Sequence, residues 1–410
     1  MPEKNPKKRN MMSKFHSEIV WGESMEWMKI HETLIQKGVV IPAPQSVVFD
    51  DIDPDNILPG TILYPGTTIC GRSTFVGRDC KIGLGGGAYI ENTQIGNQCV
   101  LMQGSYRDAT LLDGVAIRNG AELRDNCLLE EGVELGHTVG LKQTILFPYV
   151  VLGSLINFCD AIMCGGKSRK QHSEIGSCMA LYNFTPQGDK FASLFGDVAS
   201  GVFLNRAPIF IGGQTQIISP VHVGFGAVIA AGSKLSHDVD DDFLVSKNGV
   251  DMEVPFDASM LYSPDRKVKT TILFIKNLHL LHQWYGKVRL CLRNDAMHAR
   301  LYCAAQRRIE AALAERQKRF DAFCEKIPAS MQAHVRNKND RQVADHQRAI
   351  ERANAFAKSN VVENIDFSDL CAYLRENELD GIPYLEMIRV ISSERVRLCV
   401  EKMHGWVGES

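Results

Sequence analysis

Aliphatic residues recur every six positions along the middle of the chain, and this period constrains the fold more than any other feature. Three runs show the six-residue spacing: Ile117, Leu123, Leu129 and Leu135; Val133, Val139, Ile145 and Val151; and Ile211, Ile217, Val223, Ile229 and Leu235. Helices repeat every 3.6 residues and strands every 2, so neither explains this spacing. Hexapeptide repeats are typical of parallel β-helices, in which one aliphatic residue per side points inward. We therefore predict a mainly β protein built on a left-handed parallel β-helix.

Glycines follow the repeat at the positions where a coil must turn. Val76-Gly77, Leu135-Gly136, Ile211-Gly212 and Val223-Gly224 each place a glycine directly after an inward residue. Corners of a coil need sharp turns or a positive φ, which glycine adopts without strain. The glycines thus support coils with three short sides.

The repeat divides the chain of 410 residues into three parts. Residues 1–46 form a helical and capping segment, with a helix over 13–37 that stops at Gly38 and a proline-containing stretch over 39–52 that covers the end of the solenoid. Residues 47–255 form the β-helix, and residues 256–410 an α-helical domain. Within that domain, residues 272–292 are strongly apolar, so we expect them to be buried.

Composition narrows the classes of function. The net charge of −2 gives no reason to expect nucleic acid or an anionic membrane as a partner. No apolar run approaches the roughly 20 residues that span a bilayer, and the lysines near the N-terminus precede no apolar stretch, so we predict a cytoplasmic protein. The 12 cysteines include no Cys-x-x-Cys pair and are predicted to be reduced thiols, without a metal site.

Two polar stretches interrupt the repeat, at residues 164–173 (CGGKSRKQHS) and 182–191 (YNFTPQGDKF). Loops that leave a rigid scaffold often carry binding and catalytic residues. We therefore expect the functional site to include these loops.

The segment from about residue 29 to 248 resembles the acetyltransferase half of the bifunctional N-acetylglucosamine-1-phosphate uridylyltransferase/glucosamine-1-phosphate acetyltransferase family. The entry sequence GVVIPAPQSVVFDD and the exit sequence IGGQTQIISPVHVGFGAVIAAGSKLSHDV carry the resemblance. The resemblance covers about half of the chain and implies acetyl-coenzyme A, or another acyl-CoA, as co-substrate. The uridylyltransferase half, which needs a glycine-rich nucleotide loop, is not expected here.

The resemblance also implies residues that bind the acceptor and the coenzyme. Arg118, which precedes Asn-Gly-Ala-Glu-Leu, and Lys142 match the basic residues that hold a sugar phosphate. Asn183 and Lys190 match a loop that reaches the acceptor sugar, and Asn157 lies in the stretch that matches the active-site motif. The expected coenzyme contacts are Gly213, Ala231 and Lys247.

The catalytic base departs from the family. The stretch Gly153-Ser154-Leu155-Ile156-Asn157 stands where the family has Gly-His-Leu-Thr-Tyr, so Ser154 replaces the catalytic histidine. Acyl transfer to an amine needs a proton acceptor, and an unassisted serine is too weak a base. His172, in the first interrupting loop and beside Glu174, is the predicted substitute, whereas His137 and His222 are expected to be structural.

The resulting hypothesis is a coenzyme A-dependent N-acyltransferase for an amino-sugar phosphate or a nucleotide-linked amino sugar such as a UDP-linked N-acetylglucosamine precursor. A homotrimer is expected, with sites between subunits. The alternative is an inactive sugar-nucleotide-binding scaffold on the same β-helix, which the serine at position 154 favours. A zinc-dependent carbonic anhydrase on this fold would need three histidine ligands, and no suitably spaced pair occurs in the coils.

Overall fold

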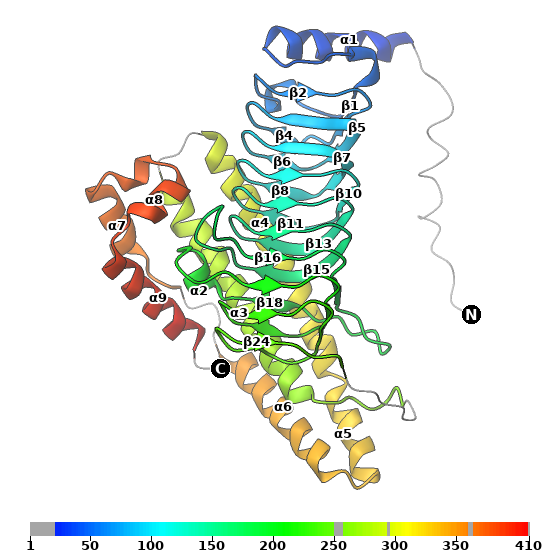
Figure 1. Ribbon diagram of the computed structural model, residues 1–410, viewed down its shortest axis with the longest axis vertical. Helices are drawn as coiled ribbons and strands as arrows, with labels where there is room; N and C mark the ends of the chain where they lie inside the picture. The colour runs from blue at the N-terminus through cyan, green and yellow to red at the C-terminus, as the bar shows by residue number, and fades with distance from the viewer. Residues whose placement is uncertain (1–20, 250–256, 293–295, 360–363, 409–410) are drawn as a thin grey trace.

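A computed structural model describes residues 21–249, 257–292, 296–359 and 364–408. Its strands form a parallel β-helix, and helices lie at one end and along one side (Figure 1). The predicted left-handed β-helix, the short N-terminal helix and the C-terminal helical region are confirmed. Each coil has three sides, so the residue that stacks on Ile117 in the next coil is Leu135, 18 positions later.

We call the three sides face 1, face 2 and face 3, in chain order within a coil, and name each corner by the faces that it joins. Face 1 consists of β2 (Ile62–Leu63), the first residues of β5 (Lys81–Glu91) and β7 (Val100–Arg107), β9 (Ala116–Ile117), β12 (Glu134–Leu135), β14 (Val151–Leu152), β16 (Glu174–Ile175), β19 (Phe210–Ile211), β22 (Val228–Ile229) and β24 (Leu244–Val245). Face 2 consists of β1 (Val48–Asp50), β3 (Thr68–Cys70), the last residues of β5 and β7, β10 (Ala121–Leu123), the first residues of β13 (Val139–Leu146) and β15 (Ile156–Met163), β17 (Ala180–Tyr182), β20 (Gln216–Ile218) and β23 (Lys234–Leu235).

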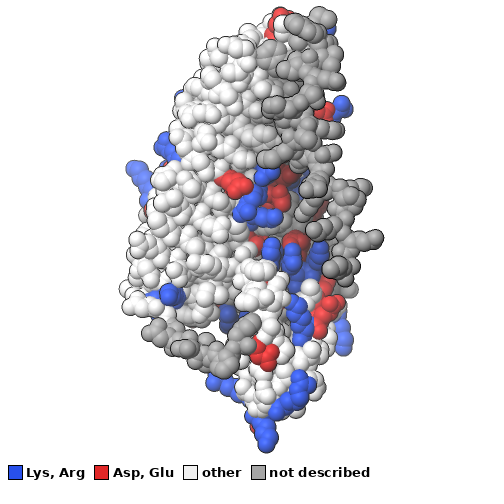
Figure 2. Space-filling view, turned by 90° about the vertical axis from the view of Figure 1, so that its right-hand side faces the viewer, with Lys and Arg blue, Asp and Glu red and all other residues white. Residues whose placement is uncertain are grey.

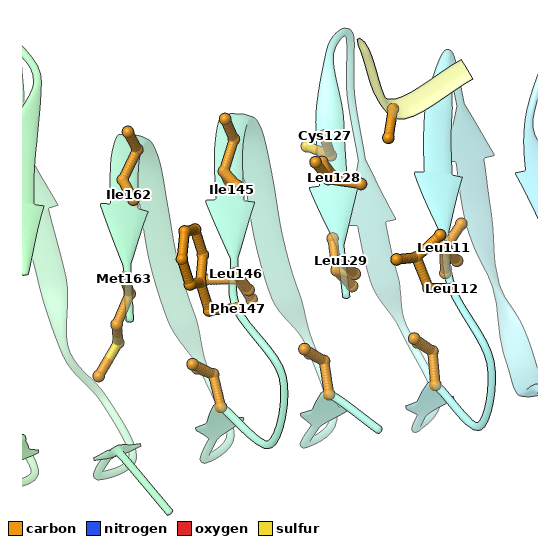
Figure 3. Packing of buried hydrophobic residues seen from close by; sticks show 14 of the residues in the cluster. Leu111, Leu112, Cys127, Leu128, Leu129, Ile145, Leu146, Phe147, Ile162 and Met163 are labelled. Atoms are coloured by element: carbon orange, nitrogen blue, oxygen red, sulfur yellow. The ribbon is translucent and has the colours of Figure 1, made fainter. Parts of the chain in front are cut away.

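Face 3 is the side on which the helices lie. It consists of β4 (Phe75–Val76), β6 (Gln94–Ile95), β8 (Ala109–Leu111), β11 (Cys127–Leu129), the last residues of β13 and β15, β18 (Ser193–Phe195) and β21 (His222–Val223). Inside the solenoid, Leu129, Leu146 and Met163 stack in successive coils (Figure 3). Side chains stacked in this way bury apolar area continuously, at about 25 cal/mol per Å² removed from water.

Two of the predicted inward residues, Ile145 and Val151, point outward in the structure. Leu135 and Leu152 pair across 17 residues, one fewer than Ile117 and Leu135, so the shortened coil shifts the phase by one. Leu152 therefore points inward, and Val151 lies half-buried on the outside of face 1. Ile145 lies on the outer side of face 3, in register with Leu128 and Ile162, and is buried there.

The glycine that follows an inward residue has a packing reason at Gly136. A Cβ atom at this position would lie 2.6 Å from the carbonyl carbon of Gly153 in the next coil. That separation is far shorter than a van der Waals contact, so position 136 cannot accept a side chain unless the backbone of the corner moves.

The N-terminal end of the solenoid is covered by α1 (Trp21–Gln36), which lies across it in Figure 1. Leu34 is fully buried, and the ring nitrogen Nε2 of His31 lies 3.0 Å from the carbonyl oxygen of Val47. The predicted helix began at residue 13, and residues 13–20 lie outside the described residues.

The other helices are α2 (Val198–Gly201), α3 (Pro264–Lys287), α4 (Ala296–Cys324), α5 (Ile327–Arg336), α6 (Asp340–Lys358), α7 (Ser368–Glu376), α8 (Tyr384–Val390) and α9 (Ser393–Val407). Helix α4 runs along corner 2–3 and presents arginines at intervals of eight residues. Arg300 donates to Asn56 at 2.7 Å, Arg308 donates to the carbonyl oxygen of Asn92 at 2.8 Å, and Arg316 pairs with Asp160. The predicted burial of residues 272–292 is confirmed for most of α3, including Leu278, Leu281 and Trp284.

A buried ion cluster joins the helical region to the solenoid at the end of face 3, where β11 leads into corner 3–1. Arg289 is fully buried and pairs with Glu131 at 2.5 Å and Glu130 at 3.2 Å, and Tyr285 donates to Glu130 at 2.6 Å. Burial raises the pKa of Glu130 to about 7. One cation between two carboxylates leaves one negative charge uncompensated, so a retained proton on Glu130 fits this site.

Candidate active site

Corner 1–2 brings several of the predicted residues onto one line. Arg118 follows β9, Ser154 follows β14, and Gly213, Ala231 and Lys247 follow β19, β22 and β24. Backbone bonds connect the coils at this corner, for example from Gly232 N to Gly213 O at 2.9 Å. Since neighbouring strands lie about 4.8 Å apart, the line is about 30 Å long. Arg118 and the three residues expected to contact the coenzyme thus share one edge of the solenoid with Ser154.

Ser154, at the position of the family histidine, is held by its neighbours. Its hydroxyl accepts from the backbone N–H of His137 at 3.2 Å, and its own N–H donates to Ser177 Oγ at 3.0 Å. His137 is exposed and lies one coil before Ser154 on the same corner. Its Nδ1 is 3.4 Å from Thr138 Oγ1, and no bond to its Nε2 is formed by the described residues. An imidazole with an available ring nitrogen therefore lies beside the serine.

The outward surface of face 2 lies next to this corner. Asn157 is exposed on this surface and lies in register between Gly140 and Ala180. Glycine has no side chain and alanine only a methyl group, so neither neighbour covers the asparagine. Lys142 lies near the far edge of the face, with Nζ 3.2 Å from Asp125. Partial burial alone would raise the pKa of Asp125, but the hydrogen bond and charge of Lys142, a backbone hydrogen bond and the charge of Arg107 together lower it.

The second interrupting loop starts at corner 2–3 and is tied to the helical region. Asn183 donates its side-chain amide to Asp160, and Asp160 also pairs with Arg316 of α4. Burial raises the pKa of Asp160, and Arg316 opposes that effect. Lys190 acts on the same carboxylate through its charge. Asn183 and Lys190 therefore lie near the same buried carboxylate, which the sequence analysis did not single out.

The far end of this loop packs against helices. Phe191 is buried, with its ring centroid 5.0 Å from that of Phe323, and Lys326 pairs with Asp189 at 2.6 Å. Within one chain, the loop is thus fixed to α4 and α5 and does not extend freely into solvent. The apolar residue at position 191, after a polar run, was the only sequence signal for this contact.

His172 lies apart from the other predicted residues. It precedes β16 at corner 3–1, so the width of face 1 separates it from Ser154 in the same chain. Its Nδ1 faces the carbonyl oxygen of Arg169 at 2.9 Å, and its Nε2 faces Glu174 at 3.3 Å. Both ring nitrogens face oxygen acceptors, so the ring must give up one contact before it accepts a proton from a substrate.

The last coils form a hollow at the coenzyme end of the line. It has a volume of about 370 Å³ and is lined by residues 237–240 and 243–247. Nζ of Lys247 lies 3.0 Å from Nε2 of His237. Burial and the charge of Lys247 both lower the pKa of His237, so a neutral imidazole accepts from the lysine. Lys247 keeps further N–H groups for an anionic ligand.

Two structural features are absent from the described residues. No group of three or more histidine, cysteine or acidic side chains that would suit a metal ion occurs in this part of the chain. Within the same residues, none of the helices combines the length and the apolar character needed to cross a bilayer. The twelve cysteines are free thiols, and Cys70, Cys80 and Cys127 are buried within the coils.

Face 2 and part of the helical region are seen together in Figure 2, from the side on which β7, β10, β13 and β15 lie in Figure 1. Most of the visible surface is uncharged, and charged side chains of both signs gather mainly in a band from the middle of the molecule to its lower end. A candidate acceptor surface on face 2 therefore lies beside a broad uncharged area.

The chain is similar to known proteins over about half of its length. It is 27% identical over 223 residues to bifunctional protein GlmU of Exiguobacterium sp., which covers 54% of this chain and 44% of the relative. Identity to bifunctional protein GlmU of Caldicellulosiruptor saccharolyticus is 32% over 213 residues, or 52% of this chain and 41% of the relative. The chain thus spans less than half the length of these relatives.

Two further comparisons add little. Protein-family models give no match to the chain. The solved structure of the polysialic acid O-acetyltransferase OatWY aligns at 13% identity over 53% of this chain and 89% of the OatWY chain. Its TM-score of 0.17 is too low to indicate a shared fold. The sequence similarity and the parallel β-helix of the structure point to the same conclusion. This chain carries a β-helix similar to the acetyltransferase part of the bifunctional GlmU proteins.

Proposed function

We propose that the protein is a coenzyme A-dependent acyltransferase that acylates the amino group of a sugar phosphate or of a nucleotide-linked amino sugar. The observation that carries the proposal is the similarity to GlmU proteins over about half of the chain, together with the line of residues on corner 1–2. In the reaction, the amine attacks the thioester carbonyl, the C–N bond forms, the C–S bond breaks, and the amine loses a proton.

The acceptor would bind across face 2. Arg118 lies at one edge of this face and Lys142 at the other, so two cations flank the surface that carries Asn157. Charge-assisted hydrogen bonds from such cations hold a phosphate dianion. The acyl-CoA would lie along the later coils of corner 1–2, with Gly213 and Ala231 leaving room for it and Lys247 near its phosphates. Holding both reactants on one edge supplies the proximity that makes the attack effectively intramolecular.

His137 fits the role of general base better than His172 within one chain. His137 is exposed on the same corner as Ser154, whereas His172 lies across face 1 and faces two oxygen acceptors. A positioned histidine contributes about 10²- to 10⁴-fold to such a proton transfer.

A homotrimer is part of the proposal. Phe210, Val228 and Leu244 lie in register on the outside of face 1 and are 43%, 37% and 73% exposed. An apolar strip of this kind is suited to contact another copy of the chain. Light scattering on the purified protein tests the assembly, and a monomer would contradict it.

The second candidate is a sugar-nucleotide-binding scaffold without turnover. Two observations favour it: Ser154 at the family histidine position, and the loop of Asn183 that is held down by Arg316 and Lys326. In that case, sugar nucleotides would bind in calorimetry although no acyl transfer takes place.

Thiol release from acetyl-CoA on addition of glucosamine-1-phosphate, and then of a panel of amino-sugar nucleotides, tests the proposal. Acceptor-dependent release supports an acyltransferase, and we expect His137→Ala to lower the rate at least about 100-fold. His222→Ala is the matched control, because that ring lies on the other side of the solenoid and its Nε2 faces the carbonyl oxygen of Gly196 at 3.2 Å. No release from folded protein with any acceptor would overturn the acyltransferase and favour the scaffold.

Ser154→His gives a second and independent readout. It restores the family histidine at corner 1–2, so an intact site should gain acyl transfer by about tenfold or more. A variant that binds acceptor normally but gains no activity would show that the coenzyme does not bind along this corner.

A further inference from the structure

A groove of about 510 Å³ lies away from the candidate active site, where the solenoid meets the C-terminal helices. One wall comes from α2 and the residues after it, within the longest interruption of the repeat. The other wall comes from the end of α8 and from α9 (Figure 1). The groove is of the size that small ligands occupy in proteins.

The bottom of the groove is apolar. Phe203, Ile388 and Ile391 are buried there, and Val396 and Val400 of α9 are half-buried beside them. An aromatic or aliphatic group bound here would lose water from the surface that it places against this floor, which favours binding by about 25 cal/mol per Å² buried.

The rim of the groove is basic. Arg206, Arg389 and Arg397 line it, and Glu401 is the only carboxylate among its lining residues. Arg206 pairs with Asp241, Arg397 donates to Glu401 at 2.7 Å, and Arg389 donates to Tyr149 at 2.9 Å. A guanidinium has five N–H donors, so each of the three retains donors for an anion.

A buried hydroxyl supplies a second, independent sign of a ligand. Ser200 lines the groove and is only 1% exposed, and its Oγ has no hydrogen-bond partner among the described residues. Its backbone N–H is satisfied by Asp197, so the side chain is not needed to complete the turn. A buried hydroxyl without a partner costs about 1–3 kcal/mol, and an acceptor atom of a ligand would remove that cost.

We propose that this groove binds a small amphipathic anion, with an aromatic or aliphatic body on the apolar floor and a phosphate or carboxylate group held by the arginines, within reach of Ser200. The site lies between the solenoid and α9, so its ligand would hold these two parts together. The proposal is independent of the proposed acyl transfer, because none of these residues belongs to the line on corner 1–2.

Isothermal titration calorimetry of the full chain with phenyl phosphate tests the site. We expect saturable binding of one molecule per chain with a dissociation constant at or below about 1 mM. Inorganic phosphate, which lacks the apolar body, and phenol, which lacks the charge, should each bind at least about tenfold more weakly. Benzoate in a parallel titration separates a phosphate preference from a carboxylate preference.

Three variants locate the binding. The double change Arg206→Gln and Arg397→Gln should raise the dissociation constant at least about tenfold, and Ser200→Ala about threefold. Val400→Trp fills the groove without removing a charge and should abolish binding. Arg395→Gln is the matched control, since Arg395 lies on α9 outside the groove, over the ring of Tyr373. We expect this control to bind as the unchanged protein does.

Two results would overturn the proposal. One is the absence of saturable binding of phenyl phosphate up to 10 mM, about ten times the expected constant. The other is binding that persists in a folded Val400→Trp variant, or that weakens equally in Arg395→Gln and in the double variant, since the probe would then occupy another place.

Discussion

Face 3 and face 1 have the same kind of inner surface and opposite outer surfaces. On face 3, the outward residues Leu128, Ile145, Ile162 and Leu194 are all buried, because helices α3 and α4 pack on this face. Figure 3 shows Leu128, Ile145 and Ile162 in register on that side. On face 1, the outward residues in register run from Glu134 through Val151 and Glu174 to Phe210, Val228 and Leu244, and the last three are exposed. The repeat therefore determines what points inward, whereas the partner of each face determines the outer residues.

The comparison also shows where the helical region is held most strongly. Face 3 carries the buried pair Glu130 and Glu131, which Arg289 of the helical region joins. No comparable buried ion group is found on the outside of face 1 among the described residues. Changes on face 3 should therefore affect the free energy of unfolding much more than changes on face 1.

The largest effect is expected for Arg289→Met. This change leaves two buried carboxylates without their cation, and breaking a buried ion pair costs about 3–5 kcal/mol. Urea unfolding, followed by circular dichroism, measures the loss. Arg397→Met removes an exposed arginine with a single i,i+4 partner and should change the free energy of unfolding by less than about 0.5 kcal/mol. Equal losses in the two variants would contradict the account of face 3.

A smaller effect is expected for Ile162→Ala. The side chain is fully buried between face 3 and the helices, so truncation should cost about 2–4 kcal/mol. Val228→Ala removes an outward side chain from face 1 and should cost less than about 0.5 kcal/mol in a dilute, monomeric sample. Thermal and urea unfolding of the two variants compare the faces directly, and a similar loss for both would mean that face 1 is covered too.

The contribution of Glu130 to the free energy of unfolding should depend on pH. Its pKa rises to about 7 on burial, against about 4.3 in an unfolded chain, so the folded state binds a proton that the unfolded state has lost. The free energy of unfolding contributed by this group therefore falls as pH rises between these values, and it levels off above pH 7. Glu130→Gln should remove this part of the slope between pH 5 and 8. An unchanged slope in the variant would show that Glu130 is ionised in the folded state.

A small effect on the free energy of unfolding is expected for Phe210→Ser on face 1. The ring is 43% exposed in one chain, so its loss should cost less than about 1 kcal/mol in a monomer. The same change should weaken self-association, which sedimentation at several protein concentrations measures. Unchanged association would remove face 1 from the proposed trimer contact.

Much of the fold could be predicted from the sequence because the inward residues obey one period. Ile117, Leu123, Leu129 and Leu135 lie as that period requires. The prediction that Val151 points inward was wrong because one coil is a residue shorter than the others. Val151 and Leu152 are both aliphatic, so the sequence alone did not show which of them turns inward. A continuous apolar stretch such as Thr144-Ile145-Leu146-Phe147 was the available sign that both sides of face 3 are covered.

The candidate site could be predicted only in part. Positions on corner 1–2 follow from the repeat, so Arg118, Ser154 and Ala231 were placed on one edge without coordinates. Loop residues do not follow the repeat, and this is why the distance of His172 from that edge could not be foreseen. The pairing of Asp160 with Arg316 joins positions 156 residues apart, and no period links them.

The arginines of α4 have a consequence for how this protein can change in length. Solenoids commonly gain or lose whole coils, because each coil contacts only its neighbours. Here Arg300, Arg308 and Arg316 are bound to coils at fixed distances along a helix that rises about 1.5 Å per residue. Four coil steps, about 19 Å, separate Asn92 from Asp160, whereas Arg308 and Arg316 lie about 12 Å apart along the helix, so their long side chains reach across the difference. One more coil would add about 4.8 Å to this difference. Helix α4 therefore limits the number of coils that can lie beside it.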